Sequence, residues 1–134
     1  MQLYKCEDIL KKYPVKFAYL FGSYNKGTYT PLSDIDLAIY WEIPEVELEI
    51  FLKLKNEIEE KCDCELSVNI VDLSQVPLPI KAEIINTGKL IFEKNRESRI
   101  EFEVKTRMEY LDFLPAYEKL VKTYLNNVKT EGIL

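Results

Sequence analysis

The fold of this chain is decided by the stretch FGSYNKGTYTPLSDIDLAIY, which spans residues 21–40. It leaves an apolar run through the small turn Gly22-Ser23 and returns to two aspartates, Asp34 and Asp36, inside a second apolar run. A helix that begins just after such a turn offers backbone N–H groups and a hydroxyl to phosphate oxygens. Two carboxylates aimed at one point repel each other unless a hard cation such as Mg²⁺ compensates them. The stretch therefore predicts a pocket for a metal-bound triphosphate.

The second half of this stretch alternates as a half-buried strand does. In the strand predicted over 34–40, Ile35, Leu37 and Ile39 share one face and both aspartates share the other. A spacing of two separates the aspartate Cα atoms by roughly 6.5 Å, so both carboxylates can reach one cation or a close metal pair. An isolated Asp-x-Asp at the start of a strand caps a turn about as often as it binds a metal. Its place one strand after a Gly-Ser turn favours the metal site.

The composition describes an acidic chain of moderate size. Its 134 residues, 47% hydrophobic and 31% charged, fit one globular domain over residues 1–134. With a net charge of −5 and its Lys and Arg scattered among acidic residues, it has no basic stripe for duplex nucleic acid. No apolar run approaches the roughly 20 residues of a membrane span, and the N-terminus has no signal-like segment. We expect a soluble, cytoplasmic protein.

The chain has no histidine, which removes several reaction types. Ser-His-Asp and Cys-His nucleophile pairs of the common design are excluded, so acid, base or metal chemistry falls to carboxylates, Lys, Tyr or the backbone. The three cysteines, Cys6, Cys62 and Cys64, cannot form a zinc site of the usual Cys/His type. We expect them to be reduced thiols that pack in the structure.

The remaining patterns predict an α/β (α+β) fold with a small mixed sheet of about four strands flanked by helices. The strands are expected at 15–21, 34–40, 66–71 and 89–92. The helices are expected at 3–13, 44–61 and 80–87, with a long C-terminal helical segment from about residue 95. Pro44 is expected in the first turn of its helix, and Pro115 is expected to kink or split the last one.

The C-terminal segment is rich in aromatic and aliphatic residues. A long helix beside a small sheet must bury one stripe, so we expect most of these residues to lie in the core. Tyr110, Phe113, Tyr117 and Tyr124 cannot all fall on one narrow stripe, however. Part of the helix is therefore expected to present an apolar patch for a homo- or hetero-oligomer.

The motif formed by Gly22-Ser23, ten intervening residues and Asp34-Ile35-Asp36 resembles the signature of the DNA polymerase β-type nucleotidyltransferase superfamily. It is most similar to the minimal nucleotidyltransferase (MNT) branch, and the resemblance covers most of the chain. It implies a polymerase β-like palm fold in which Gly22 and Ser23 hold the triphosphate of ATP. It also places Lys26 and Ser33 at nucleotide-binding positions.

In that family, the two aspartates bind Mg²⁺, so the resemblance gives Asp34 and Asp36 the metal-binding and catalytic roles. The reaction transfers a nucleoside monophosphate to a hydroxyl and releases pyrophosphate. Many such proteins are antitoxins that AMPylate a partner HEPN toxin on tyrosine. The resemblance therefore implies ATP as substrate, Mg²⁺ as cofactor and a HEPN-family toxin as partner.

Asn69 departs from the family pattern, because the family carries a third carboxylate on a neighbouring strand at this position. An amide oxygen can coordinate a cation, but it has no charge and cannot accept the attacking hydroxyl's proton. Asp72 is expected to point to the opposite, buried side of the strand and not to substitute. Asn69 is thus expected at the metal as a neutral ligand.

Three functions remain open from the sequence. The first is an ATP- and Mg²⁺-dependent minimal nucleotidyltransferase that acts as an antitoxin. The second, which Asn69 favours, is a degenerate relative that neutralises its partner by binding. The third is an enzyme that modifies a small hydroxylated molecule such as an aminoglycoside, for which 134 residues leave little room for a substrate domain.

Overall fold

The computed structural model describes residues 3–22, 35–61 and 67–131. Its strands are β1 (Val15–Phe21), β2 (Ile35–Trp41), β3 (Val68–Asp72) and β4 (Lys89–Glu93). Its helices are α1 (Leu3–Leu10), α3 (Leu48–Lys61), α4 (Leu78–Thr87) and α5 (Arg96–Glu131). Within these ranges the element types and their order agree with the expected α/β fold.

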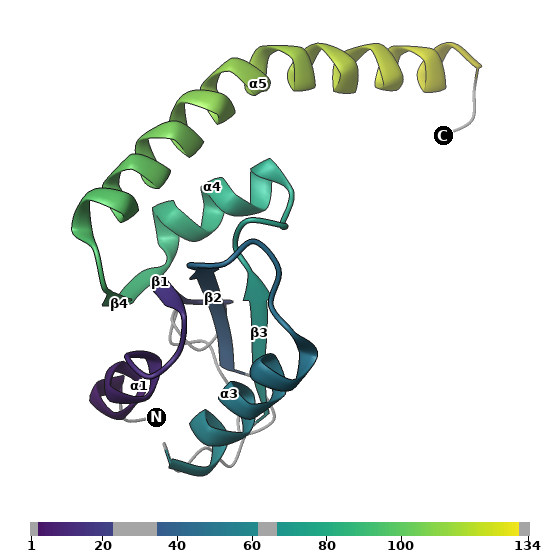
Figure 1. Cartoon of the computed structure of the whole chain (residues 1–134). Helices are drawn as coiled ribbons and strands as arrows, with labels where there is room; N and C mark the ends of the chain where they lie inside the picture. The colour runs from purple at the N-terminus through teal and green to yellow at the C-terminus, as the bar shows by residue number, and fades with distance from the viewer. Residues whose placement is uncertain (1–2, 23–34, 62–66, 132–134) are drawn as a thin grey trace.

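The strands form one mixed sheet in the order β3-β2-β1-β4 (Figure 1). The central strand β1 is antiparallel to both β2 and β4. Strands β2 and β3 are parallel, since α3 carries the chain back between them. This topology brings the end of β1 and the beginnings of β2 and β3 to one edge of the sheet.

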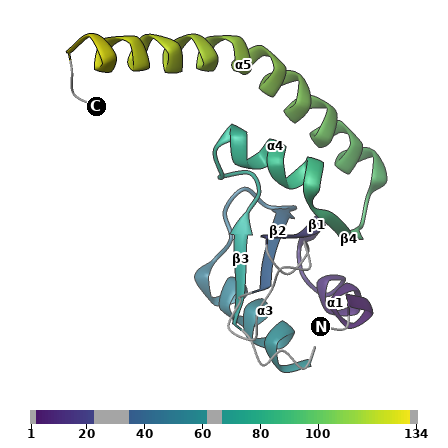
Figure 2. The same cartoon turned by 180° about the vertical axis from the view of Figure 1, so that it is seen from behind.

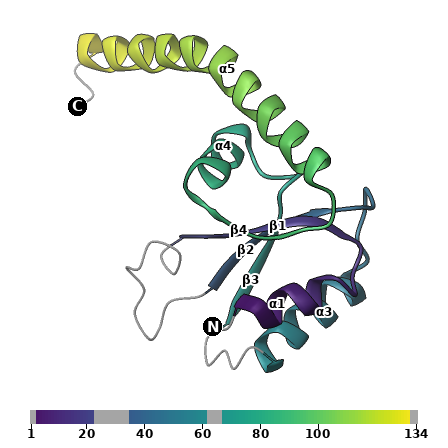
Figure 3. The same cartoon turned by 90° about the vertical axis from the view of Figure 1, so that its left-hand side faces the viewer.

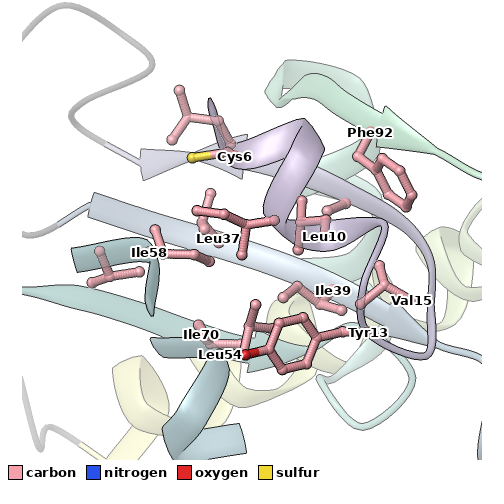
Figure 4. Packing of buried hydrophobic residues seen from close by; sticks show 14 of the residues in the cluster. Cys6, Leu10, Tyr13, Val15, Leu37, Ile39, Leu54, Ile58, Ile70 and Phe92 are labelled. Atoms are coloured by element: carbon pink, nitrogen blue, oxygen red, sulfur yellow. The ribbon is translucent and has the colours of Figure 1, made fainter. Parts of the chain in front are cut away.

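Helices cover both faces of the sheet, with α1 and α3 on one face and α4 and α5 on the other (Figure 3). The larger core lies on the first face, where aliphatic residues of β2 such as Leu37 and Ile39 pack against Leu10 of α1 and Leu54 and Ile58 of α3 (Figure 4). The cysteine of α1, Cys6, is buried in this core, where the sequence leads us to expect it to pack. The other two cysteines lie outside the described residues.

The second core lies beneath α4 and α5. Phe17 and Tyr19 of β1 pack there with Ile84 and Ile85 of α4 and with Phe102 of α5. The rings of Phe17 and Phe102 have centroids 5.4 Å apart, which fixes the first turns of α5 on the sheet. Because helices cover both faces of the sheet, residues of β1 are buried on both sides, Ala18 and Leu20 in the first core and Phe17 and Tyr19 in the second.

Helix α3 begins at Leu48, so the expectation that Pro44 stands in its first turn is wrong. The chain leaves β2 later than expected, because the Glu42 N–H still donates to Pro14 O, at 2.8 Å. Residues 42–47 then form a loop that leads into α3. Helix α4, in contrast, begins earlier than expected, since Pro79 fits its first turn.

Helix α5 runs without interruption through Pro115 and changes direction partway along its length (Figures 1 and 2). Pro115 lies inside this continuous helix, so the expected interruption is not a split. The expectation that most of its apolar residues lie in the core is wrong, because most of them beyond Arg107 are exposed. No helix in the described part of the chain is both long and apolar enough to cross a membrane.

Candidate active site

The edge where β1 ends carries the described part of the predicted site. Phe21, the last residue of β1, pairs with Asp36 of β2. Asp36 in turn pairs with Asn69 of β3 in the parallel register. Strand pairing alone therefore places Gly22, Asp36 and Asn69 beside one another across three strands.

Gly22 lies directly against the carboxylate of Asp36. Its φ of +78° is a conformation that L side chains rarely adopt. A Cβ at this position would lie 2.4 Å from Asp36 Oδ2, well inside van der Waals contact. The sequence pointed to Gly22 through its place before the phosphate-sized turn. The structure adds that only glycine lets this turn approach the aspartate so closely.

Asn69 lies beside Asp36, with its Nδ2 donating to Asp36 Oδ1 at 3.4 Å. Asp36 is half-buried and Asn69 is exposed, so both side chains reach solvent at this edge. A 180° rotation of the amide would present its oxygen toward the same carboxylate side of the site. The residue that the sequence suggested as a neutral ligand is thus adjacent to a predicted metal-binding aspartate.

Four residues of the predicted site lie outside the described residues: Ser23, Lys26, Ser33 and Asp34. Their roles stay predictions from the motif. Across residues 3–22, 35–61 and 67–131, no group of three or more acidic or Cys side chains is arranged to hold a metal ion. The described part of the site therefore contributes one carboxylate, one amide and one glycine turn.

Asp72 lies at the other end of β3, where it pairs with Ile39 and not with Asp36. Its Oδ1 accepts hydrogen bonds from the backbone N–H of Ser74 at 3.0 Å and from Ser74 Oγ at 2.7 Å. Asp72 shares the face of the buried residues Val68 and Ile70, opposite Asn69, as expected, and its own side chain is half-buried. It is held in a local turn, remote from Asp36.

A cavity of about 370 Å³ lies at the opposite end of the sheet from Gly22. Its lining includes Lys16 at the start of β1, Tyr40 near the end of β2, and Lys81 and Phe102 from the covering helices. The Lys16 ammonium lies 5.7 Å from the centroid of the Tyr40 ring. The motif gave no signal for this cavity, since its residues are scattered along the chain. Among the predicted site residues that the structure describes, none lines this cavity.

Two tyrosines with raised pKa values, Tyr13 and Tyr19, lie in the structural core and not at the site. Burial, together with a hydrogen bond from the Tyr13 hydroxyl to Glu57 Oε2 at 2.5 Å, raises the pKa of Tyr13 to about 12. Burial and a hydrogen bond to Glu103 raise the pKa of Tyr19 well above its ordinary value. Both hydroxyls act as hydrogen-bond donors that join a helix to another element.

Comparison with known proteins agrees with this geometry. Residues 4–97 match the family described as "Polymerase beta, Nucleotidyltransferase". A protein of Methanocaldococcus jannaschii, provisionally named protein adenylyltransferase MJ1547, is 32% identical over 123 residues, which are 86% of this chain and 93% of that protein.

Solved structures share the fold. The chain is similar to a chain of a toxin–antitoxin complex with AMP-PNP, with a TM-score of 0.76 and 22% identity, covering 93% of this chain and 99% of that one. It is also similar to a chain of the complex between the tri-AMPylated Shewanella oneidensis HEPN toxin and an MNT antitoxin, with a TM-score of 0.69 and 20% identity, covering 92% and 95% of the two chains. These similarities confirm the expected fold. The chain belongs to the polymerase beta nucleotidyltransferase family.

Proposed function

We propose that this protein transfers AMP from ATP to a tyrosine hydroxyl of a HEPN-family toxin and acts in the cytoplasm as the antitoxin. The observation that carries the proposal is the contact between Gly22 and the Asp36 carboxylate. It joins the predicted phosphate-binding turn to the predicted metal-binding strand at one edge of the sheet. Two similarities support the choice of substrate and partner. One relative is named as a protein adenylyltransferase, and the similar solved structures are toxin–antitoxin complexes.

The donor set fits a hard cation. Carboxylate and amide oxygens are ligands that Mg²⁺ accepts, and Mg²⁺ commonly binds through one or two carboxylates together with substrate phosphates. Asp34 and Asp36 would hold the ion, and Asn69 Oδ1 would supply a neutral ligand. When bound, Mg²⁺ neutralises the phosphate oxygens and the charge that develops on them. With two carboxylates in place of three, the site relies on the triphosphate for the remaining negative ligands.

The residues of the chain then position the reactants. The backbone N–H groups at Gly22 and Ser23 would bind the β- and γ-phosphates, assisted by Lys26, while Asp36 orients the α-phosphate. The acceptor oxygen attacks the α-phosphorus, the bond to the β-phosphate oxygen breaks, and pyrophosphate leaves. Asn69 cannot accept the hydroxyl proton, so this proton passes to an oxygen of the nucleotide. We expect transfer to be slow relative to an enzyme with a carboxylate base.

The second candidate function is a binding module that neutralises its partner without transferring AMP. The hydrogen bond from Asn69 to Asp36 favours it, because an amide, which cannot act as a base, lies beside Asp36. In this case Gly22 would hold a nucleotide or only shape the edge of the sheet. The two functions differ in whether an AMP group becomes attached to the partner.

The test is to incubate the protein with ATP, Mg²⁺ and the product of the neighbouring gene, and to measure the partner's intact mass. Addition of AMP by wild type and its loss in Asp36→Asn would support the transferase. Asn69→Asp restores a base and is expected to raise the transfer rate by about 10²–10⁴-fold. Transfer by Asn69→Asp but not by wild type would establish the binding module. No transfer by either protein to a partner that both bind would reject the enzymatic function.

A further inference from the structure

The cavity at the end of the sheet opposite Gly22 lies between the sheet and the two helices that cover its second face, α4 and α5 (Figure 3). Its volume of about 370 Å³ is within the range of sites that bind small molecules. Lys16 lies at the start of β1, and Gly22 directly follows the end of that strand. The length of β1 therefore separates this cavity from the predicted active site.

The lining of the cavity is cationic, although the chain as a whole has a net charge of −5. Three lysines, Lys16, Lys81 and Lys105, line it together with two carboxylates, Glu101 and Glu109. Lys16 and Lys81 are half-buried, whereas Lys105 and both glutamates are exposed. The deeper part of the lining is thus positive, and the carboxylates lie nearer to solvent.

Two of these lysines have no carboxylate beside them. Glu109 lies 3.9 Å from the ammonium of Lys105. Lys16 and Lys81 form no ion pair with any residue that the structure describes, and the Lys16 ammonium lies over the Tyr40 ring instead. A concave lining of one sign attracts ions of the opposite sign. Two unpaired ammonium groups match a phosphate monoester, which has a charge close to −2 at neutral pH.

A buried hydroxyl adds a hydrogen-bond donor to this lining. Thr106 is only 3% exposed, yet its hydroxyl has no hydrogen-bond partner among the described residues. No fully enclosed polar side-chain atom in that part of the chain lacks a partner, so the hydroxyl is accessible from the cavity. A phosphate oxygen in the cavity could accept its hydrogen bond, and such charge-assisted bonds are stronger than neutral ones.

The cavity also has apolar surface, which indicates that its ligand is more than an inorganic ion. Tyr40 and Phe102 both line it, with ring centroids 5.0 Å apart. A phosphate ion alone would fill only part of the volume. An organic group attached to the phosphate would contact the two rings while the phosphate contacts the ammonium groups.

We propose that this cavity binds a small phosphate monoester, such as a nucleoside or sugar phosphate, through Lys16, Lys81 and the hydroxyl of Thr106. Because the lining comes from the sheet, α4 and the first turns of α5, the bound molecule would join all three. A ligand that binds only the folded chain also stabilises it. This inference goes beyond the proposed function and does not depend on nucleotide transfer.

Isothermal titration calorimetry of the full chain tests the proposal, in a phosphate-free buffer without divalent cations. The probes are ribose 5-phosphate and AMP, and their neutral counterparts are ribose and adenosine. At least one of the two phosphates is expected to bind with a Kd at or below about 1 mM, and more tightly than its neutral counterpart. Binding of neither phosphate, or equally tight binding of the neutral compounds, would overturn the proposal.

Variants of the lining test the location of the site. Lys81→Gln is expected to weaken binding by at least about tenfold, and Thr106→Val by at least about threefold. Lys53→Gln is the matched control, because it removes the same charge from an exposed position of α3 on the other face of the sheet. It is expected to leave the affinity unchanged, and circular dichroism verifies that all three variants are folded. Wild-type affinity in either cavity variant, or an equal loss in Lys53→Gln, would overturn the proposed site.

Nuclear magnetic resonance distinguishes this cavity from the predicted active site. In spectra of the ¹⁵N-labelled chain, the phosphate that binds is expected to shift the backbone amide signals of Lys81 and Ser98. The amide signals of Gly22 and Asn69, at the opposite edge of the sheet, should stay in place. Shifts confined to Gly22 and Asn69 would show that the phosphate binds at the predicted active site, and would overturn the proposal.

Discussion

At the scale of single residues, Gly22 has two constraints that act together. Its backbone has a φ of +78°, and the space that a side chain would fill holds the carboxylate of Asp36. The first constraint concerns the backbone of the chain itself, and the second concerns a residue on another strand. The glycine therefore ends β1 and also keeps the Asp36 carboxylate within reach of the turn.

Gly22→Ala is expected to lower the free energy of unfolding by about 1–3 kcal/mol, because the alanine adds backbone strain and a contact with Asp36. Urea unfolding measures the change. The contact part can be separated with Asp36→Ala, since the alanine at position 36 removes the carboxylate that the new Cβ meets. We expect Gly22→Ala to cost less in the Asp36→Ala background than in wild type. Equal costs in both backgrounds would show that only the backbone conformation matters.

At the scale of elements, helix α5 has two parts. Its docked part contains Phe102 and Thr106, which pack against the domain, and its projecting part lies beyond Tyr110 and contains Pro115. Proline has no N–H to donate to Leu111 O, one turn earlier, and its ring clashes with that carbonyl. The helix nevertheless continues to Glu131. Since the projecting part lacks contacts with the sheet, its stability depends on its own hydrogen bonds.

Pro115→Ala is expected to stabilise the projecting part of α5 locally by about 3 kcal/mol, because it restores one helical hydrogen bond and removes a clash. The measurement is amide hydrogen exchange, in which protection should rise around positions 111–125 and stay unchanged in β1 and β2. Thr123→Ala is the control, since it raises helix propensity on the same segment without restoring a missing N–H. A similar rise in protection in both variants would contradict the role given to Pro115.

At the scale of the whole molecule, a polar network fastens α5 to the sheet. The buried hydroxyl of Tyr19 in β1 donates to Glu103 of α5. Arg99 Nη1 lies 3.1 Å from the other carboxylate oxygen of Glu103, and Arg99 Nε lies 2.9 Å from Glu93 of β4. The network thus joins two strands to one helix, alongside the packing of Phe17 on Phe102.

Tyr19→Phe is expected to lower the free energy of unfolding by about 1–3 kcal/mol, because it removes a buried hydrogen bond to a charged group. Tyr117→Phe, at an exposed position of α5, is the control and should have little effect. Chemical denaturation at neutral pH measures both changes. A loss as small for Tyr19→Phe as for Tyr117→Phe would contradict the fastening role.

The pKa of Tyr19 gives this network a pH dependence. Burial and Glu103 raise the pKa in the folded state above the ordinary value of 10.0, so an unfolded chain releases this proton first as the pH rises. The contribution of Tyr19 is therefore complete below about pH 10 and is lost above it. Tyr19→Phe should show a flatter alkaline loss of stability than wild type between about pH 9 and pH 11. Equal slopes would show that the hydroxyl is not linked to folding.

Comparison of sequence and structure shows which signals were local. The strand at 15–21 followed from its β-branched and aromatic residues, the buried face of the next strand followed from alternation, and both are present. The expected start of α3 is too early, because a backbone hydrogen bond from Glu42 to Pro14 extends the sheet beyond β2. This bond joins positions far apart in the sequence. The apolar residues of α5 were expected in the core, since periodicity shows that a face is apolar but not what covers it.

The sequence by itself determined the order of the elements, the Gly-Ser turn before an Asp-x-Asp strand, and the family, because each depends on residues close together in the chain. The family resemblance implied that Asn69 lies near Asp36, and the structure supplied the strand pairing and the hydrogen bond between them. Only the tertiary structure decided that Gly22 lies against the Asp36 carboxylate and that α5 leaves the domain. Those facts depend on strand register and on where the sheet ends, and both are set by contacts between distant segments.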